Sequence, residues 1–188
     1  MTITLTRDDC LRLAETLDNE TKAYLVDDCI ATWDAKDLWY YEPVAYFEDK
    51  TIVSVMFANV EHVNGNNILY IQRVFTIPEF RKKGHFRELF NAVYTTEFNR
   101  GVRFLKLFVN ADAYKAYKAM KFNMIQQTED GNYYLIFIPM LHCTLEYNNF
   151  INSLSPVSYF LPDSIKSYYL DLQRKYNIID VRSEEHTS

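Results

Sequence analysis

The stretch IPEFRKKGHFR, residues 77–87, places five basic side chains around one glycine, although the chain of 188 residues carries a formal net charge of −5. Before it, the β-branched and aromatic segment 68–77 predicts a strand that Pro78 ends. After it, an apolar stripe at helical spacing predicts an amphipathic helix, formed by Phe86, Leu89, Phe90, Val93 and Phe98. Because a helix N-terminus has unpaired N–H groups and a partial positive charge, the stretch predicts an anion-binding loop.

Two other interpretations of the same basic residues remain open at this point. They could form a solvated helix start, or a nucleic-acid patch, although the acidic remainder of a chain with pI ≈ 5.4 would repel a phosphate backbone. The stretch matches neither the Walker A loop nor the G-x-G-x-x-G fingerprint, because it contains a single glycine. A phosphate-binding loop of another kind is therefore the prediction.

The surrounding sequence predicts an α/β fold with a mixed sheet. Gly101 is placed to end the helix, and strand 102–109 follows directly, so the unit is strand–helix–strand, and such crossovers make parallel pairs. Strand candidates 44–47 and 52–60 precede it and predict an antiparallel meander with 68–77. Further elements are predicted at both ends of the chain: a capping box at Thr6 and Asp9, helix 21–32, a short helix 113–120 capped by Asp112, a hairpin of 122–127 and 133–138, and helix 165–176 capped by Asp163 or Ser164.

Composition limits the class of protein. Three cysteines, Cys10, Cys29 and Cys143, lie far apart without a C-x-x-C spacing, which argues against a disulfide framework or a zinc site and suits a reducing compartment. The N-terminus has no apolar signal segment, and no apolar run reaches the length of a membrane span. We expect a cytoplasmic protein with no metal and no membrane partner, and nucleic acid is not the expected partner.

Two motifs resemble those of the GNAT N-acetyltransferase superfamily. The family's pyrophosphate loop, [RQ]-x-x-G-x-[GA], is matched by Arg81 and Gly84, with Phe86 in place of the small third residue. A second pattern follows the next strand: an Asn and then A-x-x-x-Y-x-x-x-G-F. It is matched by Asn110, Ala113, Tyr117 and Phe122, with Lys121 in place of the glycine. The resemblance extends over most of residues 1–140 and is best at 68–122.

The resemblance implies a GNAT-like mixed, splayed sheet flanked by helices on both faces, with acetyl-CoA as co-substrate and no metal. The splay is expected at a β-bulge near Arg73–Phe75, where the pantetheine arm would pair with the strand. The implied cofactor contacts are Val74, Phe75, Thr76, Arg81, Lys82, Lys83, Gly84, His85, Phe86, Arg87 and Asn110. The backbone amides of 82–87 would hold the pyrophosphate, and the side chains of Lys82, Lys83 and Arg87 the ribose 3′-phosphate.

The implied reaction is transfer of an acetyl group to a primary amine by direct attack in a ternary complex. Tyr117 stands at the position of the family's general acid, and Glu61 is the first candidate for the base, followed by His62 and Glu42. The acceptor would be a small-molecule or peptide amine, and a homodimer stays open. The alternative is a catalytically inactive acyl-CoA-binding or interaction module of the same fold.

The expected organisation has three parts. Residues 1–140 form the acetyltransferase domain, and residues 141–181 form an aromatic and helical C-terminal extension. Residues 182–188, RSEEHTS, resemble the translation of a common sequencing-adapter oligonucleotide, so we expect them to be a non-native tail.

Overall fold

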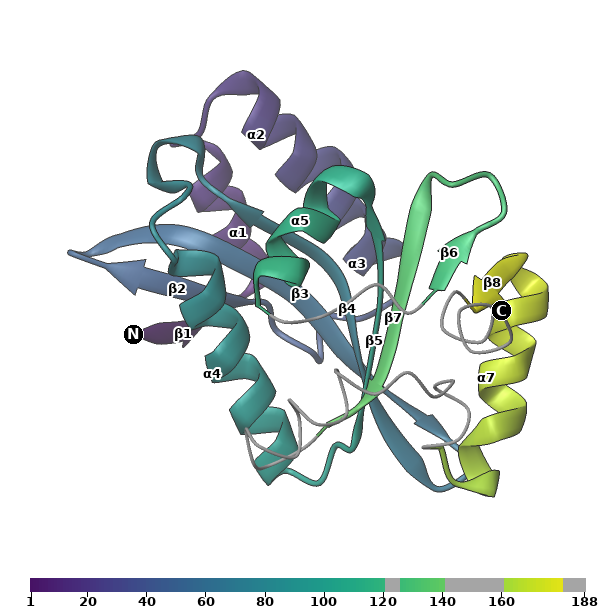
Figure 1. Cartoon of the computed structure of the whole chain (residues 1–188). Coiled ribbons are helices and arrows are strands. Elements are labelled where there is room, and N and C mark those ends of the chain that lie inside the picture. Colours follow the sequence, from purple (N-terminus) through teal and green to yellow (C-terminus); the bar gives the residue numbers. More distant parts are fainter. Residues whose placement is uncertain (121–125, 141–160, 181–188) are drawn as a thin grey trace. The chain divides into compact units, whose positions relative to one another are not determined.

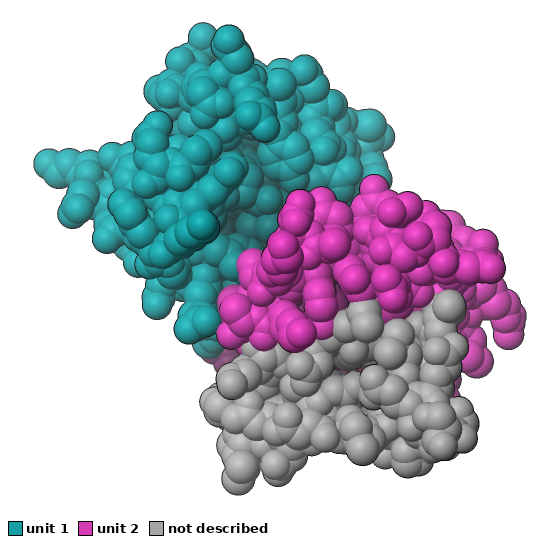
Figure 2. All heavy atoms as spheres, turned by 45° about the horizontal axis from the view of Figure 1, so that its top comes forward, with its two compact units in different colours: residues 1–59, 71–96 teal, residues 60–70, 97–188 magenta. Residues whose placement is uncertain are grey.

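The computed structural model describes residues 1–120, 126–140 and 161–180. It divides into two compact units, which Figure 2 shows in different colours. Unit 1 comprises residues 1–59 and 71–96, and unit 2 comprises residues 60–70 and 97–188. The chain passes between the units through two strands and one helix: β3 (Thr51–Val63), β4 (Asn66–Thr76) and α4 (His85–Asn99).

The other elements belong to one unit each (Figure 1). Unit 1 contains β1 (Thr2–Thr4), α1 (Arg7–Ala14), α2 (Asn19–Ala23), the π-helix η1 (Tyr24–Ile30), α3 (Ala31–Ala35), β2 (Val44–Glu48) and the 3₁₀ turn η2 (Pro78–Phe80). Unit 2 contains β5 (Phe104–Asn110), α5 (Ala111–Ala119), β6 (Gln126–Thr128), β7 (Tyr133–Pro139), α7 (Asp163–Lys175) and β8 (Ile178–Asp180).

The strands follow the order β1-β2-β3-β4 in unit 1 and continue from β4 as β5-β7-β6-β8 in unit 2. The pairs β1–β2, β2–β3, β5–β7, β6–β7 and β6–β8 are antiparallel. The strand β4 and its neighbour β5 are joined by α4, the strand–helix–strand connection that the sequence predicts. The predicted fold class, a mixed sheet flanked by helices, is confirmed.

The core of unit 1 lies between the strands and the helices α1–α3. Trp33 is fully buried and packs edge-to-face on Phe57 at 5.2 Å between ring centroids. Its indole N–H donates to the carbonyl of Tyr41 at 2.9 Å, so the polar edge of the ring is satisfied inside the core. In Figure 1, α1–α3 cover one face of β2 and β3, and α4 lies on the other face.

The helical layer of unit 1 begins as predicted and extends further than predicted. Thr6 accepts from the N–H of Asp9 at 3.1 Å, and the Asp9 carboxylate accepts from the N–H of Thr6 at 2.9 Å, which is a capping box. The helix predicted at 21–32 runs from Asn19 to Ala35, with Asp18 as its N-cap. Its middle seven residues form a π-helix, which the periodicity of the sequence did not predict.

The core of unit 2 lies between its strands and the helices α5 and α7. The ring of Phe104 on β5 stacks on Phe137 of β7, and Tyr169 of α7 is buried against Phe137. The helix α5 begins one residue after Asn110, whose side chain accepts from the N–H of Ala113 at 2.8 Å. The predicted cap Asp112 is therefore wrong, because β5 ends at Asn110 and the helix starts there.

The C-terminal helix is also shifted from its prediction. It spans Asp163–Lys175, with Pro162 at the N-cap position, so neither Asp163 nor Ser164 is the cap. Lys121, Phe122, Cys143 and the predicted tail 182–188 lie outside the described residues, as does much of the predicted extension. Among the described residues, no helix is long and apolar enough to span a membrane.

Candidate functional site

The basic loop of unit 1 has the backbone of an anion-binding turn. It follows η2 and leads directly into α4, which begins at His85. Lys82 and Gly84 are both left-handed, with φ of 63° and 83°. Left-handed residues in a turn bring successive N–H groups into one concavity, which is typical of a nest for anions. The left-handed Lys82 also carries strain of order 1–3 kcal/mol, which persists where the surroundings impose it.

Two side chains of the loop face the protein. The guanidinium Nε of Arg81 donates to the carbonyl oxygen of Thr76 at 3.0 Å, so Arg81 fastens the loop to the end of β4. The His85 ring is buried beside Tyr46 and Phe80, and its Nε2 lies 3.1 Å from the Glu48 carboxylate. A cofactor contact from His85 would therefore come from its backbone N–H, because its ring is engaged elsewhere.

The other basic side chains of the loop are exposed. Lys82, Lys83 and Arg87 extend into solvent around the start of α4, and the ammonium of Lys83 lies 5.6 Å from the ring centroid of Phe80. Within the described part of the chain, Lys82 and Lys83 make no ion pair. These charges, with the helix N-terminus beneath them, fit a phosphorylated ligand such as CoA.

The C-terminal end of β4 is hydrogen-bonded to a serine of β3. Ser54 donates to the carbonyl of Phe75 at 3.0 Å and also lies 3.1 Å from the hydroxyl of Thr76. The ring of Phe75 packs edge-to-face on Tyr24 of η1. Val74, the residue before Phe75, is half-buried. The strand residues predicted to bind the pantetheine arm are thus held in place by Ser54 and Tyr24.

Two consecutive residues of β4, close to the predicted position of the bulge, contact the helical layer of unit 1. Gln72 accepts from Lys36 at 2.8 Å, and the next residue, Arg73, donates to Asp28 at 2.8 Å. In a regular strand, consecutive side chains point to opposite faces, but here both reach the helical layer α1–α3. The strand β4 continues through this segment to Thr76, so the bulge expected near Arg73–Phe75 stays a prediction, and Arg73 lies against Asp28.

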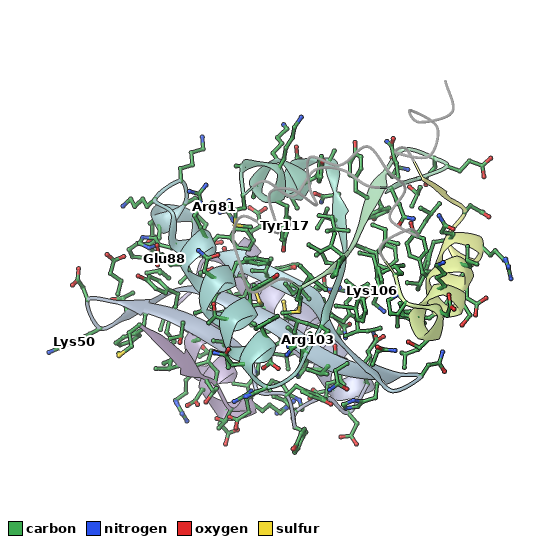
Figure 3. All side chains as sticks on the ribbon, turned by 60° about the horizontal axis from the view of Figure 1, so that its bottom comes forward. Lys50, Arg81, Glu88, Arg103, Lys106 and Tyr117 are labelled. Atoms are coloured by element: carbon green, nitrogen blue, oxygen red, sulfur yellow. The ribbon has the colours of Figure 1, made fainter. Side chains whose placement is uncertain are left out.

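Unit 2 holds Asn110 and Tyr117 at the two ends of α5. The Asn110 side-chain oxygen is used by the cap, and its amide NH₂ is the group left to bind a ligand. Tyr117 extends from α5 (Figure 3) and is only 2% exposed. The helix packs on β5 and β7, and the ring of Tyr114 stacks on Tyr134 at 4.6 Å. The phenol of Tyr117 therefore sits in a water-poor environment.

Glu61 is bound by two side chains that the sequence analysis missed. The ammonium of Lys106 lies 3.0 and 3.1 Å from the two carboxylate oxygens, and the hydroxyl of Tyr168 donates to Oε2 at 2.9 Å. The side chain of Lys106 is 5% exposed, and its ammonium lies 4.1 Å from the centroid of the Tyr70 ring. Figure 3 shows Lys106 on β5 beside α7. Burial and then Glu61 raise the pKa of Tyr168. The signal for Lys106 was a lone charge within the apolar strand FLKLFV.

The predicted site residues thus lie in two sets. Unit 1 brings together Val74–Thr76 and the loop Arg81–Arg87, whereas Glu61, Asn110 and Tyr117 belong to unit 2. Among residues 1–120, 126–140 and 161–180, no three His, Cys, Asp or Glu side chains are arranged to hold a metal ion. An open groove of about 610 Å³ in unit 1 is lined by residues of α1, β1, β3 and Ile77–Phe80, and no predicted site residue lines it.

A family model described as the acetyltransferase (GNAT) family matches residues 10–122, which is more than half of the chain. This protein belongs to the GNAT acetyltransferase family. The matched range includes both sets of predicted site residues, from β4 and the phosphate loop to Tyr117. The resemblance carried by Arg81, Gly84, Ala113 and Tyr117 is thereby confirmed at the level of the family. No curated protein matches the chain.

Solved structures confirm the fold. The ribosomal-protein-S18-alanine N-acetyltransferase of Escherichia coli is 17% identical, with a TM-score of 0.55 over 76% of this chain and 95% of that one. YncA of Salmonella typhimurium, a putative acetyltransferase solved with acetyl-CoA, is 13% identical, with a TM-score of 0.55 over 77% and 95% of the two chains. The PaiA N-acetyltransferase of Thermoplasma acidophilum, solved with coenzyme A, is 15% identical, with a TM-score of 0.53 over 72% and 96%.

Proposed function

We propose that this member of the GNAT family transfers an acetyl group from acetyl-CoA to a primary amine of a small molecule or peptide. The observation that carries the proposal is the loop Arg81–Arg87, which combines two left-handed residues, a helix N-terminus and exposed lysines at the end of β4. The structures of YncA and PaiA, solved with acetyl-CoA and CoA, support the choice of co-substrate. The S18-alanine N-acetyltransferase supports an amine acceptor.

The proposed contacts divide according to chemistry. The backbone N–H groups of Lys82–Arg87 bind the pyrophosphate, because a helix N-terminus and a nest favour anions. The side chains of Lys82, Lys83 and Arg87 bind the ribose 3′-phosphate. Backbone groups of Val74, Phe75 and Thr76 and the amide of Asn110 bind the pantetheine arm, as an added strand binds the edge of a sheet.

Acetyl-CoA supplies the acetyl group in an activated thioester. The N–H of Phe75 is the proposed donor to the carbonyl oxygen of that thioester as negative charge develops there. Tyr117 holds a proton at its phenolic oxygen and gives it to the departing sulfur. Glu61 is the proposed acceptor of the amine proton, through water, since its carboxylate is 28% exposed despite its two partners. Direct attack within a ternary complex follows from these roles.

The test combines binding with turnover. Calorimetry with acetyl-CoA should show binding, and a thiol-release assay with a panel of primary amines should show acceptor-dependent release. Tyr117→Phe should lower kcat while leaving CoA affinity within about twofold, because only the proton donor is removed. Tyr114→Phe on the same helix is the matched control. Equal turnover of Tyr117→Phe and wild type across pH would eliminate Tyr117 as the acid, and absence of calorimetric heat would eliminate the function.

The alternative, a non-catalytic acyl-CoA-binding module, is favoured by one observation. The carboxylate of Glu61 accepts from Lys106 and Tyr168, so the candidate base is engaged within unit 2. A module of this kind would bind acetyl-CoA in calorimetry with no acceptor-dependent thiol release. The two functions therefore give opposite results in the turnover assay and the same result in the binding assay.

A further inference from the structure

Three contacts in succession join β4 to the helical layer of unit 1. Lys36 donates to Gln72 at 2.8 Å, and Arg73 donates to Asp28 at 2.8 Å. Two residues further, the ring of Phe75 packs edge-to-face on Tyr24 at 5.9 Å. Arg73 and Phe75 are two residues apart, so they lie on the same face of the strand. Each of them has a partner on the helix that faces it.

The helix that contacts Arg73 and Phe75 is irregular. Tyr24 and Asp28 belong to η1, a π-helix of seven residues. Such segments are rare, mostly appear as single turns, and often occur at functional sites, because the wider turn costs stability and persists only where it serves a geometry. Here Tyr24 presents an aromatic ring and Asp28 a carboxylate to β4, and each contacts one residue of the strand.

The contact between β4 and η1 contains one positive and one negative group, Arg73 and Asp28. Arg73 and Asp28 are 33% and 44% exposed as side chains, and Arg73 also donates from Nη1 to the carbonyl of Gln72 at 2.8 Å. The neighbouring groups are neutral near pH 7: burial raises the pKa of the Cys29 thiol to about 12 and raises the pKa of the Tyr24 phenol. Asp28 is thus the carboxylate that orients Arg73, and Arg73 in turn holds a backbone carbonyl of β4.

We propose that Arg73 and Asp28 are positioning residues for the acetyl-transfer reaction: their ion pair fixes the backbone of β4 immediately before Val74 and Phe75. The proposal rests on the proposed function, which places the reacting thioester at these two residues. Neither side chain needs to touch a substrate. The pair acts through the direction of the Phe75 N–H, which must point at the developing oxyanion, and an error of about 1 Å in such a group can lower the rate by as much as a hundredfold.

The experiment uses the full chain, four single variants and one double variant. Asp28→Asn removes a charge at nearly constant volume, and Arg73→Gln removes the guanidinium and shortens the side chain. Arg7→Gln is the matched control, because Arg7 makes an ion pair with Asp34 at 3.0 Å in the same helical layer, at a similar exposure of 48% and 40%. Thiol release gives kcat and KM, calorimetry gives CoA affinity, and thermal unfolding gives stability for every variant.

We expect Asp28→Asn and Arg73→Gln to lower kcat roughly ten- to a hundredfold, with KM for acetyl-CoA and CoA affinity within about twofold. The double variant should be no slower than the slower single variant, because both remove the same pair. Arg73→Lys, which keeps the charge, should recover part of kcat, whereas Arg7→Gln should keep it all.

The proposal is overturned if Asp28→Asn turns over like wild type, or if Arg7→Gln loses as much kcat for the same loss of thermal stability. Absence of acceptor-dependent thiol release from the wild-type protein is a different result. It removes the proposed function itself, and the positioning role falls with it.

Discussion

The ion pair between Lys106 and Glu61 predicts an asymmetric response to mutation. Lys106 is 5% exposed, whereas Glu61 is 28% exposed and also accepts from Tyr168. Replacing Glu61 by Leu removes the carboxylate that lies 3.0 Å from the buried ammonium of Lys106, which costs about 3–5 kcal/mol of unfolding free energy. Replacing Lys106 by Met leaves a carboxylate that reaches water and keeps one hydrogen bond, so the cost is about 1–2 kcal/mol.

The double variant Glu61→Leu/Lys106→Met completes the cycle. It buries two apolar side chains in place of the pair and leaves the Tyr168 hydroxyl without either partner, so its net cost is about 1 kcal/mol. The measured coupling between the two positions should then be roughly 3 kcal/mol or more, with the double variant more stable than Glu61→Leu alone.

Urea unfolding followed by circular dichroism measures all three variants. Lys115→Met is the surface control, because its ion pair with Asp112 is 3.6 Å long and both side chains are more than 80% exposed. It should change stability by less than about 0.5 kcal/mol. A Lys106→Met variant less stable than Glu61→Leu would refute this prediction. It would show that the deeper burial of the ammonium does not decide which of the two single changes costs more stability.

Three further predictions concern the loop, the cap and the thiols. Gly84→Ala should lower the free energy of unfolding by about 1–2 kcal/mol and weaken acetyl-CoA binding in calorimetry. Gly65 has nearly the same φ of 79° and equal open space for a Cβ, so Gly65→Ala should cost as much stability and leave binding intact. Equal binding by both variants would contradict a role of the loop in binding acetyl-CoA. Asn110→Ala should lose about 1 kcal/mol of stability and some CoA affinity, because it removes both the cap and the amide. Asn110→Asp keeps the cap and should lose CoA affinity alone. Full CoA affinity in Asn110→Asp would exclude a ligand contact from the amide NH₂. Burial raises the pKa of the Cys10 and Cys29 thiols from about 9 to about 12, so the thiols of the unfolded chain ionise first and stability should fall between pH 9 and 12. Cys29→Ala should make this fall of stability with pH shallower in urea titrations. An unchanged dependence of stability on pH would show that the Cys29 thiol does not cause the fall.

Local sequence patterns were sufficient where the interaction itself is local. The capping box at Thr6 joins residues three apart, and the phosphate loop is a turn whose glycine and flanking elements are contiguous. Asn110 and Asp112 are both good cap residues, and only the end of β5 decides between them. Tertiary packing, not propensity, sets that end, so the sequence alone selected the wrong cap.

Contacts between distant segments were outside the reach of pattern analysis. Lys106, Glu61 and Tyr168 come from β5, β3 and α7, so their meeting depends on strand register and on where α7 docks. The π-helix was equally out of reach, because its residues have ordinary helix propensities and nothing in their periodicity indicates a wider turn. A lone lysine within an apolar strand nevertheless implies a buried counter-ion, and this signal could have directed attention to the acids of neighbouring strands.

Lys106 also offers a way to decide whether Glu61 takes the proton of the amine, because its ammonium lies 3.0 Å from the Glu61 carboxylate and the two groups can be removed separately. If Glu61 is the base, Glu61→Gln should lower kcat far more than Lys106→Met does, because an amide cannot accept the proton of the amine. If Glu61 only anchors α7, both variants should lower stability, and the loss of kcat should follow the loss of stability in each of them. The comparison of the two variants therefore separates chemistry from structure at a residue where the loss of activity in Glu61→Gln alone could not.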